Sequence, residues 1–334
     1  MRYFLFGAGD LILHAAEWLK RNKRQTILIC ADRHLREPFG AHGSFANHLD
    51  AQGIEYRLST DPNTDDDLRS LIAPGCCGMS IGAAWIFKQP FIDLFDLGLY
   101  NLHYARLPHD RGGGGFSWKI MRRERRGGCA IHRISSKADA GPIVKYCEFT
   151  YPAATRITAE MAAFNAIRAK AMIEDFLDEL AGGSAPQANA QPDHFSMYWP
   201  RLDTDLHGFV DWTWKAAEIE RFICAFDDPY KGCSSFVGDR RVRLKQAFTF
   251  VSDGGFHPFQ AGVIYRKTAS EVFIACHDAA LIVHSVQDDA GENMLPSLRV
   301  GDRFHTPAEH LEKAKAARVY YHPGGKSLTR QSLA

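Results

Sequence analysis

The first half of the chain alternates short apolar runs with segments of helical spacing. Residues 3–6 and 26–30 are apolar runs without charges, and they have the length and side chains of buried strands. Between them, residues 11–21 repeat their apolar positions at helical spacing. Such alternation predicts a mostly parallel α/β sheet covered by helices. Further strands are expected at 54–58, 79–81, 100–103, 130–134 and 143–149, and further helices at 45–52, 65–72 and 116–123.

The pattern changes after a long amphipathic segment, residues 158–180, which predicts one helix ending at Gly182 and Gly183. Residues 184–193 are rich in Ala, Pro, Gln and Asn and have no apolar periodicity, as is typical of a linker. Beyond them, a helix at 216–225 is followed by short strand-like runs that predict a small β-barrel or sandwich. We therefore expect a first domain over 1–183, a linker over 184–194, a second domain over 195–310 and a tail over 311–334.

Composition narrows the class of protein. The 334 residues are long enough for two domains, and 46% hydrophobic with 24% charged residues is typical of a globular protein. A net charge of +1 argues against a strongly electrostatic grip on nucleic acid. The eight cysteines have neither CxxC nor metal-site spacing, and no apolar run reaches the roughly 18 residues of a membrane span. We expect a reduced, cytoplasmic protein that needs no metal and has no membrane contact.

Three chemically useful side chains follow strand-like runs near the middle of the chain. Asn101 and His103 lie at the end of one run, and Asp139 lies in the loop after another. In α/β sheets, catalytic groups gather beyond the carboxyl ends of strands. An amide can donate to a developing oxyanion, an imidazole can accept a proton, and a carboxylate can orient the imidazole. The trio therefore predicts acyl transfer to an amine, with Asn101, His103 and Asp139 as the catalytic residues.

Further motifs surround this trio. In the first half of the chain they are Asn101-x-His103, Leu107-Pro108 with Arg111-Gly112, His132-Arg133-Ile134 and Asp139-x-Gly141-Pro142-Ile143, and in the second half Asp211-Trp212 and Pro229-Tyr230-Lys231-Gly232. In order, spacing and residue type together, these motifs resemble those of the folate-dependent formyltransferases. That family includes methionyl-tRNA formyltransferase, glycinamide ribonucleotide formyltransferase and the sugar N-formyltransferases. The resemblance implies a Rossmann-like catalytic domain followed by a small OB-like β-barrel domain, and it covers most of residues 1–310.

The same resemblance implies N10-formyltetrahydrofolate as formyl donor, held in a pocket with backbone hydrogen bonds and flat apolar walls. Trp85 has a second interpretation as an ordinary core residue. The glycine run after Arg111 would let the backbone approach a ligand closely. The implied donor-binding residues are Ala83, Ala84, Trp85, Ile86, Phe87, Ser136, Lys137 and Ala138, and the implied substrate-facing residues are Tyr104, Arg106, Arg111, Gly113 and Gly114.

The sequence indicates the acceptor amine less clearly than the formyl donor. We expect the acceptor to be a nucleotide-linked amino sugar, with methionyl-tRNA as the first alternative. Residues 34–44 and 184–193, where the tRNA enzyme typically carries basic stretches, hold few basic side chains, and tRNA binding needs several. Water, as in a formyltetrahydrofolate hydrolase, and another small amine stay open. A homodimer is compatible with the sequence. The basic cluster Lys119, Arg122, Arg123, Arg125 and Arg126 is expected to be a solvated helix end, with phosphate binding as the alternative.

Overall fold

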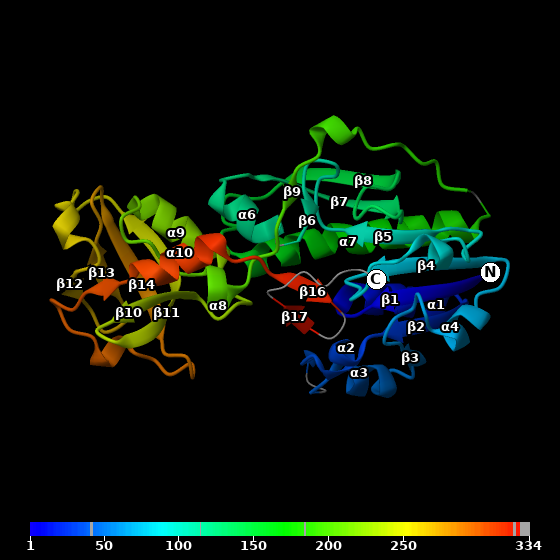
Figure 1. Ribbon diagram of the computed structural model, residues 1–334, viewed down its shortest axis with the longest axis horizontal. Helices are drawn as coiled ribbons and strands as arrows, with labels where there is room; N and C mark the ends of the chain where they lie inside the picture. Colours follow the sequence, from blue (N-terminus) through cyan, green and yellow to red (C-terminus); the bar gives the residue numbers. More distant parts are fainter. Residues whose placement is uncertain (41–42, 114, 184, 323–324, 328–334) are drawn as a thin grey trace.

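Two β-sheets lie toward opposite ends of the molecule's long axis (Figure 1). The computed structural model describes residues 1–40, 43–113, 115–183, 185–322 and 325–327. We call the part built on the seven-stranded sheet the first lobe and the part built on the six-stranded sheet the second lobe. The predicted combination of an α/β unit with a separate β-rich unit is therefore confirmed, while the domain boundaries stay predictions.

The sheet of the first lobe has the strand order β3-β2-β1-β4-β5-β7-β8. Its first five strands in this order are parallel, and the last two are antiparallel to their neighbours, which confirms the predicted mostly parallel sheet. In β1, Tyr3 and Leu5 join one apolar core while Phe4 and Phe6 join another, because successive side chains point to opposite faces. The strands are β1 (Arg2–Gly7), β2 (Gln25–Cys30), β3 (Tyr56–Leu58), β4 (Cys76–Ile81), β5 (Leu99–His103), β7 (Arg126–Arg133) and β8 (Ile143–Thr150).

Helices cover both faces of this sheet. The long helix α7 (Thr158–Ala181) buries one side, where Phe176 meets Tyr100 edge-on with ring centroids 4.9 Å apart. Helix α1 (Asp10–Arg21) shares that core, whereas Phe91 and Leu68 of shorter helices belong to the core on the other face. The remaining helices of the lobe are α2 (Asp32–Arg36), α3 (Phe45–Ala51), α4 (Asp66–Ser70), α5 (Gln89–Ile92) and α6 (Gly115–Met121).

The second lobe is an antiparallel sheet in the order β12-β13-β14-β11-β10-β15. Helix α9 (Ala216–Ala225) packs against it and shares its apolar core, which includes Val242, Leu244 and Leu281. The short α8 (Thr204–His207) precedes α9. The strands are β10 (Cys233–Val237), β11 (Arg240–Phe250), β12 (Ile264–Lys267), β13 (Val272–Ala275), β14 (Ala280–Gln287) and β15 (Phe304–His305).

The two lobes are joined by packing as well as by the chain. Ile120 of α6 and Met161 of α7 belong to the apolar core of the second lobe. The hydroxyls of Ser117 and Thr158 both donate to the carbonyl of Ala225, at 2.7 and 3.2 Å. These contacts fix the orientation of α9 against the first lobe.

The predicted linker is seated on the first lobe. Asn189 pairs with Ile143 through backbone hydrogen bonds, and just beyond the linker β9 (Tyr198–Trp199) pairs in parallel with β6 (Arg111–Gly112). Its residues lack apolar periodicity because backbone pairing, rather than side-chain burial, holds them. Part of the predicted tail is also regular: α10 (Ala308–Ala316) precedes a hairpin of β16 (Tyr320–His322) and β17 (Gly325–Ser327). Among the helices described, none combines the length and apolar character of a membrane span.

Candidate active site

Sheet register places three polar residues in one row across the first sheet. Ser80 of β4 lies opposite Asn101 of β5, and Asn101 lies opposite His132 of β7. The Ser80 hydroxyl donates to Asn101 Oδ1 at 3.0 Å. His132 Nδ1 is 2.9 Å from the carbonyl of Arg133, which can only accept, so the neutral ring carries its proton there. Its Nε2 then accepts from Asn101 Nδ2 at 3.2 Å. These two hydrogen bonds fix the orientation of the Asn101 side-chain amide, with its oxygen toward Ser80 and its nitrogen toward His132.

Asp139 lies in the loop after β7 and faces the same space. Its backbone has φ of 53°, in the left-handed region that Asp tolerates better than most residues. Its Oδ1 is 3.5 Å from His103 Nδ1 and 3.8 Å from His132 Nε2, and its Oδ2 accepts from the backbone N–H of Gly112 at 3.2 Å. The structure therefore brings Asn101, His103 and Asp139 to one place, as the trio's prediction requires.

Asp139 is held as a carboxylate. Burial raises its pKa, but His103 and His132 lower it through the positive charge that each carries when protonated, and protonated His132 and the Gly112 N–H also hydrogen-bond the carboxylate. Together these effects outweigh burial and hold the pKa of Asp139 well below the usual range. Gly112 can approach this closely because its φ is 94°, and a Cβ there would lie 2.6 Å from the carbonyl oxygen of Trp199. The glycine thus lets the loop fit between the carboxylate and β9.

The other nitrogen of His103 faces a backbone carbonyl. Nε2 lies 3.2 Å from the Asp110 oxygen, so the neutral ring can keep its proton on Nε2 and leave Nδ1 unprotonated beside Asp139. The side chain of Asp110 in turn accepts from Lys119 Nζ at 2.5 Å, and it lies 3.5 Å from Arg106 Nε. Lys119 and Asp110 are only 1% and 4% exposed. Lys119 of the basic cluster is therefore buried, contrary to the expected solvated helix end.

Replacing Lys119 with methionine is expected to lower the free energy of unfolding by about 3 kcal/mol or more, because Asp110 would stay buried without its main partner. Burial lowers the pKa of Lys119, and the neighbouring Asp110 partly offsets that effect. Urea unfolding of Lys119→Met and of Lys119→Met/Asp110→Asn measures how much of the lost free energy of unfolding comes from leaving Asp110 buried without Lys119. The double variant should lose less stability than the single one, and a single variant as stable as the wild type would contradict the account.

Arg106, expected to face the substrate, lies elsewhere. Arg106 is 4% exposed, and its guanidinium pairs with Glu124 at 3.3 Å and Glu148 at 3.7 Å in addition to Asp110. It is absent from the wall of the catalytic cavity as far as the chain is described. The structure places Arg106 in a buried charge network, where it shares Asp110 and Glu124 with other basic side chains.

Glu124 makes this network sensitive to acid. Burial raises its pKa, but hydrogen bonds from the side chain and backbone of Arg126 and the charge of Arg106 outweigh burial and lower the pKa to about 2. A carboxyl whose folded pKa is lowered adds stability above its unfolded value of 4.5 and loses that contribution as pH falls toward 2.

Glu124→Gln should therefore lower the free energy of unfolding by about 1 kcal/mol at neutral pH, with a difference that shrinks below about pH 4.5. Urea titrations at several pH values measure this, with the exposed Glu312→Gln as the matched control. If wild type and Glu124→Gln differed in free energy of unfolding by the same amount at every pH, the ionised carboxylate of Glu124 would not be the group that stabilises the fold.

The trio opens into a cavity of about 570 Å³. Of the residues expected to bind donor or substrate, Ala83, Trp85, Ile86, Phe87, Lys137, Ala138, Tyr104 and Gly113 line it. Ala84, Ser136, Arg106 and Arg111 do not line it, and Gly114 lies outside the described residues. Trp85 is 7% exposed and its indole N–H donates to the Thr60 carbonyl at 2.9 Å, so it is a core residue that also forms part of the wall.

Arg111 instead ties the linker to the catalytic loop. Its guanidinium donates to Gln191 Oε1 at 3.0 Å and to Asp193 Oδ1 at 2.9 Å. The Gln191 amide donates to the carbonyls of Asp139 and Gly141 at 2.9 and 2.7 Å. The linker thus holds the loop that carries Asp139, and this is a positioning role that sequence spacing does not reveal.

Several cavity residues were not identified from the sequence. Ser80 and His132 reach the site by register between strands. Tyr198 and Arg201 come from the segment that follows the predicted linker, and Tyr230 comes from the second lobe. His132 sits within a recognised motif, which was the available signal for it. Tyr230 likewise lies within a recognised motif, Pro229-Tyr230-Lys231-Gly232. For Tyr198 and Arg201 no local pattern marks a binding role, because their place depends on how the lobes pack.

Comparison with known protein families supports the sequence resemblance. Residues 204–298 match the family model described as formyl transferase, C-terminal domain. Methionyl-tRNA formyltransferase of Dechloromonas aromatica (strain RCB) is 28% identical over 254 residues, which span 73% of this chain and 78% of that protein.

Solved structures share the fold. WlaRD, a sugar 3N-formyl transferase solved in the presence of dTDP and 5-N-formyl-THF, superposes with a TM-score of 0.65 at 15% identity, covering 85% of this chain and 97% of that one. The N-formyltransferase from Helicobacter canadensis, solved with folinic acid and dTDP-3-aminofucose, gives 0.66 at 14% identity, covering 85% and 99%. Methionyl-tRNA formyltransferase from Clostridium thermocellum gives 0.52 at 16% identity, covering 74% and 93%.

Proposed function

Because the chain belongs to the formyltransferase family, we propose that it transfers a formyl group from N10-formyltetrahydrofolate to the amine of a nucleotide-linked amino sugar. The observation that carries the proposal is the convergence of Asn101, His103 and Asp139 on one cavity. A hydrogen-bond donor, a base and a carboxylate are the groups that attack of an amine on a formyl carbon requires.

The donor would occupy the part of the cavity bordered by Trp85, Ile86 and Phe87. These side chains supply apolar walls, and the loop with Lys137 and Ala138 supplies backbone polar groups on another side. The hydrogen bond from Trp85 to Thr60 fixes the indole ring in advance of binding. When bound, the donor supplies an activated formyl carbon. Solved relatives named for folinic acid or formyl-THF support this choice of donor.

Asn101 would stabilise the oxyanion of the tetrahedral intermediate. One N–H of its amide is donated to His132, and the other has no hydrogen-bond partner among the residues described. Ser80 holds the amide oxygen, so the nitrogen end stays toward the cavity. A preorganised donor of this kind lowers the barrier because it needs no reorientation as charge develops.

His103 would accept the proton of the attacking amine on Nδ1. The Asp110 carbonyl anchors Nε2, and the Asp139 carboxylate, 3.5 Å from Nδ1, stabilises the imidazolium that forms. The Gly112 N–H and the Gln191 amide keep Asp139 and its loop in place. His103 would then return this proton to the donor nitrogen as the bond between that nitrogen and the formyl carbon breaks and tetrahydrofolate leaves. Each side chain in this account has a partner that positions it.

An amino sugar is favoured over tRNA by the state of the basic cluster. Arg126 pairs with Glu124, Arg123 pairs with Glu218, and Arg125 donates to three backbone carbonyls. Arg122 lies over the ring of Trp199, 4.6 Å from its centroid. Cations already engaged within the protein are less available to phosphates of a polyanion. Methionyl-tRNA is the second candidate because a sequence relative carries that name.

The proposal includes the finer organisation expected from the sequence. Residues 1–183 would form the catalytic domain, 184–194 the connection and 195–310 an OB-like domain, with 311–334 as the tail. A cytoplasmic location and a homodimer are proposed with it. A hydrodynamic mass of twice the chain, measured by light scattering, supports the dimer, and a monomer excludes it.

The acceptor is tested by following tetrahydrofolate release from N10-formyltetrahydrofolate. The panel consists of nucleotide-linked amino sugars, initiator methionyl-tRNA and buffer alone. Release that depends on an amino sugar is the expected result. Release with tRNA would replace the amino sugar by the second candidate, and release in buffer alone would make the protein a hydrolase.

A further inference from the structure

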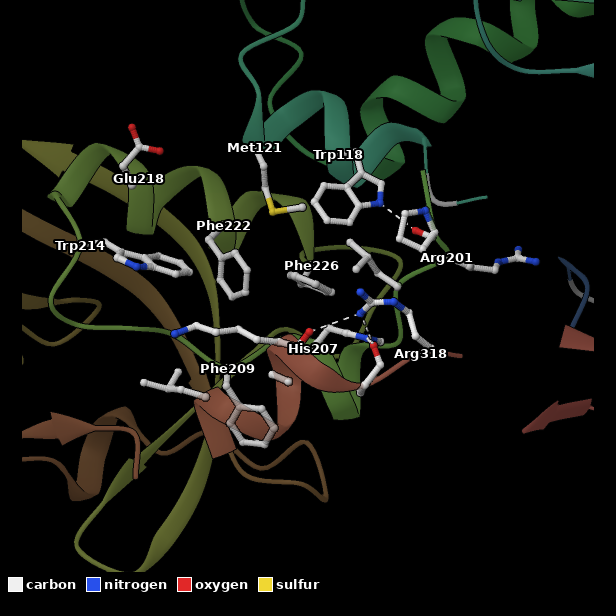
Figure 2. Close-up of a pocket in the computed structure, with 16 residues that line it drawn as sticks. Trp118, Met121, Arg201, His207, Phe209, Trp214, Glu218, Phe222, Phe226 and Arg318 are labelled. Atoms are coloured by element: carbon white, nitrogen blue, oxygen red, sulfur yellow. Dashed lines mark hydrogen bonds between the residues drawn. The ribbon is translucent and has the colours of Figure 1, made fainter. Parts of the chain in front are cut away.

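A second cavity, of about 550 Å³, lies between the lobes (Figure 2). Its walls come from α6, the segment 200–202, α9, and α10 with the residues that follow it. None of Asn101, His103 and Asp139 lines it, and Arg201 is the one described residue that borders both cavities. The proposed formyl transfer gives this second cavity no role.

Aromatic side chains form much of its surface. Trp118, Trp214 and Phe222 are half-buried, and each turns toward the cavity in Figure 2. The indole N–H of Trp118 donates to the Pro200 carbonyl at 2.8 Å, so its polar group is satisfied within the wall. Phe222 meets Trp214 edge-on at 5.1 Å between ring centroids. Such walls favour a planar apolar ligand, because ring faces and edges can both be matched.

The rim is positively charged. Arg201, Lys315 and Arg318 are exposed there, and among the described residues of the lining Glu218 alone carries a carboxylate. Glu218 already forms ion pairs with Arg221 and Arg123. Arg318 contacts backbone carbonyls of its own segment, and Lys315 lies 3.4 Å from the exposed Glu312. Cations exceed anions at this rim, so the field favours a negatively charged group next to the apolar walls.

We propose that this cavity binds a small molecule that joins a planar aromatic group to an anionic group. The ring lies against Trp118 and Phe222, and the anion lies near Lys315 and Arg318. The side chains that make this match come from both lobes, so the site exists only in the assembled chain. Through Arg201 it adjoins the space that the acceptor would occupy in the catalytic cavity.

The test uses the full chain and two fluorescent probes that differ in charge. 8-Anilinonaphthalene-1-sulfonate carries an aromatic group and an anion, and N-phenyl-1-naphthylamine carries the aromatic group alone. We expect saturable binding of both probes at one site, with the sulfonate binding more tightly. Ala314→Trp, which fills the cavity from α10, should weaken both probes by about tenfold or more, because the bulky ring occupies the space of the ligand.

Ala316→Trp, on the exposed side of α10, is the matched control and should leave affinity within about twofold. Circular dichroism and thermal unfolding check that each variant is folded. If Ala314→Trp does not fold, Leu202→Trp takes its place and fills the cavity from the opposite wall. Non-saturable binding, or equal binding by the filled and control variants, would overturn the proposal.

The charge requirement is tested separately. Lys315→Gln/Arg318→Gln should weaken the sulfonate about fivefold and leave the uncharged probe unchanged, as expected for loss of partly exposed charge contacts. Lys313→Gln on the same helix, outside the lining, is the control. Equal effects on the two probes, or no effect on either, would overturn the assignment of an anionic ligand.

Discussion

His103→Ala is expected to lower kcat by about 10²–10⁴-fold, the contribution that a positioned general base typically makes. The ring lies with Nδ1 beside Asp139 and Nε2 against the Asp110 carbonyl, so no other described side chain stands in the same position to take the amine proton. The variant should stay folded, because the cavity side of the ring is solvent-accessible and its removal leaves the buried Lys119–Asp110 pair intact.

Steady-state formyl transfer under saturating donor and acceptor measures the effect. His284→Ala in β14, whose imidazole pairs with Glu271 in the second lobe, is the control and should keep wild-type turnover. Turnover of His103→Ala close to that of the wild type, in protein with an unchanged melting temperature, would remove His103 from the reaction.

Asp139→Asn is expected to cost a similar 10²–10⁴-fold in kcat, because it removes the charge that stabilises the imidazolium while keeping a side chain of the same shape. The pKa of Asp139 is held well below the usual carboxyl range, so the wild-type group stays ionised throughout the neutral and mildly acidic range. Its titration therefore cannot reduce wild-type activity near neutral pH, and the variant's deficit should persist at every pH from about 6 to 8.

A matched comparison separates this role from general charge loss. Asp175→Asn on α7 removes an exposed carboxylate that pairs with Lys145, and it should leave kcat unchanged. If Asp139→Asn retained turnover, or if raising the pH restored it, the carboxylate would have a structural rather than a catalytic role.

The strands and helices with strong apolar patterns could be predicted from the sequence. Expected strands at 3–6 and 26–30 correspond to β1 and β2, and the expected helix at 158–180 corresponds to α7 within one residue. Helix α2 could not be predicted, because its five residues, Asp32–Arg36, include a single apolar side chain. Its start is stabilised by a local hydrogen bond, in which His34 accepts from the backbone N–H of Ala31. Local hydrogen bonding of this kind leaves no periodic signal.

The site shows the same division. The motif residues Asn101, His103 and Asp139 could be selected because their types suit one reaction, and the structure brings them within reach of one another. The residues that position this trio could not be identified from the sequence. In the sequence Lys119 resembles a surface charge, whereas in the structure its Nζ lies 2.5 Å from the Asp110 carboxylate. The linker has no apolar pattern because the backbone pairing of Asn189 and the hydrogen bonds of Gln191 hold it in place. Contacts between distant segments carry this information, and hydrophobic periodicity does not.

The central claim, that this cavity moves a formyl group onto an amine, is tested most directly by following the formyl carbon. Wild-type protein would be supplied with ¹³C-formyl-labelled N10-formyltetrahydrofolate and a nucleotide-linked amino sugar, and the products analysed by NMR and mass spectrometry. The account predicts that the label appears as an N-formyl amide on the sugar and that Asp139→Asn yields almost none. Label recovered as free formate, or amide formed equally by the wild type and Asp139→Asn, would contradict it.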